Sequence, residues 1–96
     1  MARHSWTYQD NEVCCKKFIE YYIIRQSDLR LSAFVRLLKL DLPDISENSL
    51  KWKVQNIKYL SAEAGMKDSL KCGTAAHCSP DNIKAFYTLL SEHHLK

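Results

Sequence analysis

Apolar residues recur every three or four positions over most of the chain, which is the spacing of one face of a helix. The first such segment follows Thr7, which with Asp10 three residues later predicts a helix start held by a capping box. It runs to about Arg25, and Trp6 is placed to pack on its first turns. The apolar side of this segment consists of Val13, Cys14, Phe18, Tyr21 and Tyr22.

A second helical pattern lies within "RQSDLRLSAFVRLLKLDLPD", where Leu29, Ala33, Phe34, Leu37 and Leu38 share one side. Pro43 disfavours helical backbone at the residue before it, so the segment should stop there. A polar turn follows.

A third helix is predicted from about Ser49 to Ala64. Asn48 and Ser46 are both N-cap candidates, and Gly65 is well placed as a C-terminal stop.

Residues 66–78 show no helical period and are expected to be irregular. Ser79-Pro80 then predicts a sharp helix start, because serine caps and proline suits the first helical position. The chain is therefore expected to be all-α, with four helices in one domain over residues 1–96. The predicted core is Trp6, Phe18, Tyr22, Phe34, Leu38, Leu50, Val54, Ile57, Leu60, Phe86 and Leu90, and the last helix is expected to turn Ile83, Phe86, Tyr87 and Leu90 inward.

Composition supports a folded and mildly basic domain. The 96 residues are 46% hydrophobic and 26% charged, with two glycines, two prolines and a net charge of +3. No apolar run is long enough to cross a membrane, and "MARHSWTYQD" lacks the apolar centre of a signal peptide. A cytoplasmic protein is the expectation.

The cysteines suggest free thiols rather than a disulfide framework, because Cys14 and Cys15 are neighbours on a predicted helix. Cys72, His77 and Cys78 are three possible zinc ligands within seven residues, but a zinc site needs a fourth. His93, His94 or Cys14 would complete it only if the fold brought one of them close. A turn with partly buried thiols is the favoured interpretation, with no metal and no cofactor.

The third predicted helix, "SLKWKVQNIKYL", carries more chemistry than a core requires. Lys51, Gln55 and Lys58 follow one flank of its apolar side, and another flank holds Trp52, Asn56 and Tyr59. Lysine binds phosphates, glutamine and asparagine can pair with adenine, and an aromatic ring can stack or press on a sugar. A plainer interpretation is a basic helix with a solvated polar face, which is common.

A resemblance favours the first interpretation. The layout with Trp6-Thr7 near the start and "SLKWKVQNI" in the third helix resembles a helical domain at the N-terminus of bacterial HNH-type and restriction-like nucleases. "SPDNIKAF" resembles the Pro-x-Asn opening of that family's last helix. The family implies a Myb/SANT-like, helix-turn-helix arrangement that binds DNA, in which Ser49 caps the third helix while Lys53, Gln55 and Asn56 recur by type.

This chain departs from the family because no HNH nuclease segment follows the last helix. A glycine-rich phosphate loop is also missing, so no enzyme is predicted. We expect a bacterial or phage module that binds double-stranded DNA, as a regulator or accessory protein of a mobile-element or defence system, with the third helix in the major groove. The alternative is a protein-interaction module, such as a phage or defence accessory or inhibitor, with no direct DNA contact. The predicted DNA-binding residues are Ser49, Lys51, Trp52, Lys53, Gln55, Asn56, Lys58 and Tyr59, with Arg36 and Lys39 from the preceding helix.

Overall fold

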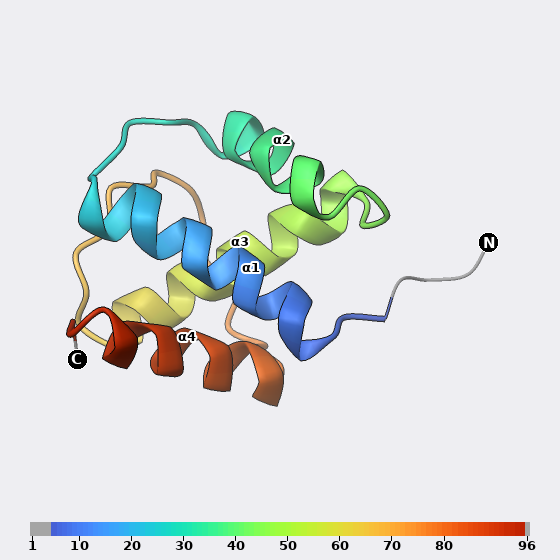
Figure 1. Cartoon of the computed structure of the whole chain (residues 1–96). Coiled ribbons are helices and arrows are strands. Elements are labelled where there is room, and N and C mark those ends of the chain that lie inside the picture. The colour runs from blue at the N-terminus through green and yellow to red at the C-terminus, as the bar shows by residue number, and fades with distance from the viewer. Residues whose placement is uncertain (1–4, 96) are drawn as a thin grey trace.

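The fold is built from helices alone in a computed structural model that describes residues 5–95. Within that range there is no strand, which confirms the predicted all-α class (Figure 1). The four α-helices and one π-helical segment are α1 (Tyr8–Phe18), η1 (Ile19–Ile24), α2 (Leu31–Asp41), α3 (Glu47–Glu63) and α4 (Pro80–Glu92).

The first helix begins where the sequence predicted. The Thr7 hydroxyl accepts a hydrogen bond from the Asp10 backbone N–H at 3.1 Å, and the Asp10 carboxylate accepts one from the Thr7 N–H at 3.0 Å. This reciprocal pair is a capping box. The helical rod continues to Ile24, but from Ile19 onward it widens into the π-helix η1, which the sequence pattern did not predict.

The start of α3 differs from the prediction by two residues. Ser46 is the N-cap, and its hydroxyl accepts from the Ser49 backbone N–H at 3.2 Å. Ser49 is therefore wrong as the capping residue, because it already lies in the first turn, where its hydroxyl bonds that of Ser46 at 3.0 Å. Gly65 follows the helix with a φ of +72°, a conformation that glycine adopts at low cost, and ends it as predicted.

Helices α1 and α3 cross at the centre of the molecule, and α2 and α4 lie on opposite sides of this crossing (Figure 1). Helix α1 packs against each of the other three, while α2 lies against α3 at the far side of the molecule from α4. Figure 1 also shows that α1 and α4 lie side by side and run in the same direction. The connection between them therefore includes α2, α3 and the irregular segment of residues 64–79, which we call the α3–α4 connection.

Aromatic rings fill the centre where the first helical rod meets α2. The Tyr22 ring lies 5.4 Å from the Phe18 ring and 4.9 Å from the Phe34 ring, the latter edge-on. Such pairs add to the free energy gained from burying the rings. Of the eleven residues predicted for the core, Trp6 is only half-buried, and the other ten are buried.

The sequence prediction of which side of α4 faces the core was wrong for two of its four residues. Ile83 and Tyr87 on α4 are 40% and 37% exposed, although both were expected to point inward. Ala85 and Leu89 are buried in their place beside Phe86. Asn82 is buried as well, and its side-chain oxygen lies 3.6 Å from the Cys15 sulfur of α1, so the inward face of α4 is displaced by about one residue from the predicted one.

Candidate nucleic-acid interface

The outward side of α3 is open over its first two turns and again at its last turn, where Ala62 and Glu63 are exposed. In the first two turns Lys51 is exposed, and Trp52 next to it is 63% exposed. Further along the helix Gln55, Asn56 and Tyr59 are half-buried. Interaction with the Glu63 carboxylate raises the pKa of the Tyr59 phenol. Among the predicted DNA-binding residues of α3, Lys51 and Trp52 are therefore open to solvent, whereas those further along the helix are partly covered.

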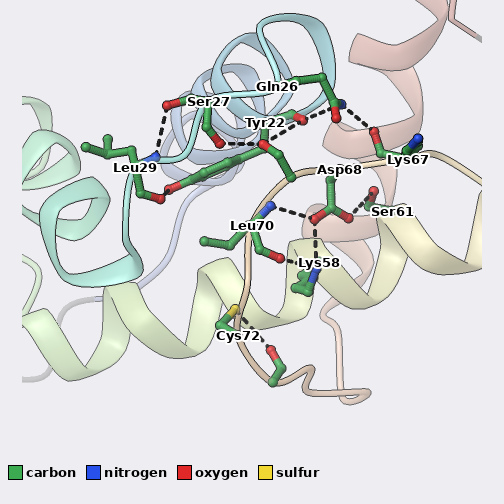
Figure 2. Close-up of polar contacts among 12 residues, drawn as sticks. Tyr22, Gln26, Ser27, Leu29, Lys58, Ser61, Lys67, Asp68, Leu70 and Cys72 are labelled. Atoms are coloured by element: carbon green, nitrogen blue, oxygen red, sulfur yellow. Dashed lines mark hydrogen bonds and ion pairs between the residues drawn. The ribbon is translucent and has the colours of Figure 1, made fainter.

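The α3–α4 connection causes this division because it crosses the outward side of α3. The Ala75 backbone N–H donates to the Gln55 carbonyl at 3.2 Å. The Cys78 thiol lies 3.5 Å from the Asn56 carbonyl oxygen. Figure 2 shows the part of this segment between Leu70 and Cys72 passing across the helix. Helix α3 therefore cannot lie along a groove over its whole length.

Lys58 was predicted to reach DNA phosphates, but its ammonium group is already occupied. Its Nζ lies 2.7 Å from an Asp68 carboxylate oxygen and 2.6 Å from the Leu70 carbonyl oxygen (Figure 2). Asp68 also accepts hydrogen bonds from the Ser61 hydroxyl and the Leu70 backbone N–H. Lys58 therefore anchors the α3–α4 connection to α3, and it does not belong to an open basic surface.

Lys53 is also unsuited to a DNA contact. The residue is 6% exposed, and its Nζ lies 4.6 Å from the centre of the Trp6 ring, as in a cation–π contact. Burial lowers the pKa of this ammonium group, although the nearby Cys14 and Cys15 thiols and the Asp81 carboxylate act in the opposite direction. The lysine therefore joins Trp6, ahead of α1, to α3.

Lys39 stabilises the turn between α2 and α3. Its Nζ donates to the Pro43 carbonyl at 3.0 Å and to the Ile45 carbonyl at 2.8 Å. Three of the five predicted lysine and arginine contacts, Lys39, Lys53 and Lys58, are thus engaged inside the protein.

The remaining two, Arg36 and Lys51, are exposed and line a small hollow of about 140 Å³ between α2 and α3, together with Glu47. Lys51 also lines a larger hollow of about 790 Å³, together with Arg30 and Lys71. None of these four side chains has an ion-pair partner within residues 5–95. We call Arg30, Arg36, Lys51 and Lys71 the basic face.

Sequence reasoning missed two members of the basic face. Arg30 is the N-cap residue of α2, and Lys71 belongs to the α3–α4 connection. Arg30 was expected inside the second helix, whose predicted apolar side begins at Leu29, so nothing in the sequence marked it as the N-cap. Lys71 lies in a segment without periodicity, so no pattern could place it beside Lys51.

The cysteine thiols are free, and no group of three or more potential metal ligands gathers in the part of the chain that the structure describes. Cys72 and Cys78 are half-buried and have carbonyl oxygens as neighbours. Cys14 and Cys15 are fully buried, and burial raises the pKa of Cys14 to about 12 and that of Cys15 further. A thiol whose pKa is raised holds less of the nucleophilic thiolate at any given pH.

Alkylation is therefore expected to divide the cysteines into two pairs. In the native protein Cys72 and Cys78 should react with iodoacetamide at least about tenfold faster than Cys14 and Cys15, whose reaction needs the core to open. Peptide mass spectrometry after timed labelling measures the four rates. In denaturing urea the four rates should converge. Native labelling of Cys15 as fast as that of Cys78 would contradict the described packing.

Comparisons with known proteins add no relative: no family model, no curated protein and no solved structure matches this chain. Within residues 5–95, none of the helices combines the length and apolar character that crossing a membrane requires.

Proposed function

We propose that this domain binds double-stranded DNA through its basic face and the first two turns of α3. The observation that carries the proposal is the division of the cations: those of the basic face lack acidic partners, while Lys39, Lys53 and Lys58 are held inside. Unpaired cations on one side of a small domain are the electrostatic footprint of a phosphate-binding surface.

Helices α2 and α3 supply a geometry that fits this proposal. They pack against each other and are joined by the short turn of residues 42–46, as in a helix-turn-helix pair. In that motif the residues near the N-terminus of the second helix contact base edges. Lys51 and Trp52 lie in that part of α3, ahead of the crossing by the α3–α4 connection. The proposed DNA interface therefore uses the beginning of α3, and Gln55, where the α3–α4 connection crosses the helix, is its last residue.

The resemblance to nuclease-associated domains supports a role as a regulator or accessory protein of a mobile-element or defence system. One observation favours a second candidate, a protein-interaction module. Leu40 on α2 is 79% exposed and Trp52 is 63% exposed, and large exposed apolar side chains are common at protein interfaces. Binding to duplex DNA at low salt decides between the two candidates.

Removing the Lys51 charge is expected to weaken binding to all duplex sequences alike, because a lysine that contacts phosphate carries no sequence information. The slope of log K against log salt should fall by about 0.9 for the one lost phosphate contact. Fluorescence anisotropy of Lys51→Ala across a salt series measures both effects.

Lys16→Ala is the matched control, because Lys16 is an exposed lysine on α1, outside the basic face. It should retain most of the wild-type affinity and slope. The DNA proposal fails if the folded wild type does not bind duplex at low salt, or if Lys16→Ala and Lys51→Ala change the slope equally.

A further inference from the structure

The larger hollow beside the basic face has the size and walls of a small-ligand site. It has a volume of about 790 Å³, open on one side to solvent, between the start of α2, Lys51 of α3 and the α3–α4 connection at Ser69 and Lys71. Ligand sites in proteins commonly span roughly 300–1,000 Å³. The cavity can therefore hold a group larger than a single ion.

The charges around this cavity favour an anion. Arg30, Lys51 and Lys71 come from three separate segments and line the same space, and Asp28 is the one carboxylate among the lining residues. Three positive charges and one negative charge leave a net charge of +2 at the site. Leu31 and Ser32 also line it, and the amide groups of this first turn of α2 have no side-chain cap, so they remain available as donors.

The wall opposite α2 is fixed by hydrogen bonds. The Ser69 backbone N–H donates to the Tyr22 carbonyl at 3.1 Å, and the Ser69 hydroxyl donates to the Ser27 carbonyl at 2.5 Å. The Tyr22 hydroxyl donates to the Leu29 carbonyl at 2.8 Å (Figure 2). A cavity whose walls are already ordered loses less conformational entropy when a ligand binds.

We propose that this cavity is a binding site for a dianionic phosphate group, a phosphomonoester, held by Arg30, Lys51 and Lys71. The net charge of the lining matches a dianion better than the single charge of an internal phosphodiester. Two sources carry this chemistry: the terminal phosphate of a DNA strand and a free mononucleotide. The assignment to a DNA end rests on the proposed function, whereas the phosphate site itself does not.

The first experiment titrates the full chain, labelled with ¹⁵N, with inorganic phosphate at about pH 8, above the second pKa of a phosphate group. Chloride keeps the ionic strength constant. Amide signals of Leu31, Ser32 and Lys71 are expected to shift and saturate. Lys51→Ala and Lys71→Ala should each weaken the phosphate Kd about tenfold, the size of one charge-assisted contact.

Lys67→Ala is the matched control, since Lys67 is an exposed lysine of the same connection that does not line the cavity. It should leave the phosphate Kd within about twofold of wild type. The phosphate site is overturned if the shifts do not saturate, or if Lys67→Ala weakens binding as much as Lys71→Ala does.

The second experiment identifies the source of the phosphate. One duplex is compared with and without 5′-phosphate ends, beside a free mononucleotide. Tighter binding of the phosphorylated duplex, lost in Lys71→Ala, supports a DNA end. Equal binding of both duplexes overturns the assignment to a DNA end. Saturable shifts of the amide signals with the mononucleotide then assign the site to free nucleotides. Saturation by inorganic phosphate without any duplex binding overturns the proposed DNA function while supporting the phosphate site.

Discussion

Replacing Lys58 with methionine is expected to lower the free energy of unfolding by about 3 kcal/mol. The substitution leaves the Asp68 carboxylate, whose side chain is only 6% exposed, without its cation. Breaking a buried ion pair by removing one partner typically costs about 3–5 kcal/mol, because the remaining charge stays desolvated. The lower end applies here because the Lys58 side chain is 17% exposed.

Urea denaturation followed by circular dichroism measures this loss. Lys67→Met makes the same chemical change at an exposed lysine of the α3–α4 connection and should cost under about 0.5 kcal/mol. The double variant Lys58→Met/Asp68→Asn removes both charges and should regain part of the loss. A cost for Lys58→Met under about 1 kcal/mol, the range of exposed ion pairs, would show that this contact does not anchor the connection.

Replacing Ile57 with alanine is expected to cost about 2–5 kcal/mol of stability, since truncating a large core side chain loses its transfer free energy and leaves a cavity. Ile57 is fully buried in the middle of α3, the helix around which the others pack. Thermal and urea unfolding measure the effect, with the dependence of free energy on urea unchanged if only packing is lost.

Ile83→Ala is the control because it makes the identical substitution on α4 at a side chain that is 40% exposed. It should cost under about 1 kcal/mol, as surface substitutions generally do. Equal losses for Ile57→Ala and Ile83→Ala would mean that α4 turns the face predicted from the sequence toward the core, in place of the one described above.

The sequence was sufficient for features whose causes lie within a few residues. The caps at Thr7 and Ser79 and the stop at Gly65 depend on local backbone chemistry, so their residue types alone indicate them. The apolar side of α3 was equally clear, because Leu50, Val54 and Ile57 repeat at helical spacing and are all buried.

The candidate site could be predicted only in part because a lysine's role depends on distant partners. Lys58 bonds groups ten and twelve residues away, at Asp68 and Leu70, in a segment whose path no periodicity describes. Lys53 contacts the Trp6 ring, and the helices α1 and α2 lie between these two residues in the sequence. Lys58 lies seven residues after the exposed Lys51, on the same flank of the helix, so the pattern could not separate these two. Lys53 lies three residues after Leu50 and four before Ile57, so its position on the apolar side did indicate burial, although not its contact with Trp6.

The parallel arrangement of α1 and α4 has a consequence for how fast the chain folds. Their contacts join residues as far apart as Cys15 and Asn82, a separation of 67 positions. Such contacts form only after a long loop has closed, and domains rich in them fold more slowly than bundles of helices that are neighbours in sequence. A nascent chain that lacks α4 leaves uncovered the part of α1 that packs against it, so the native core is complete only when α4 has been synthesised.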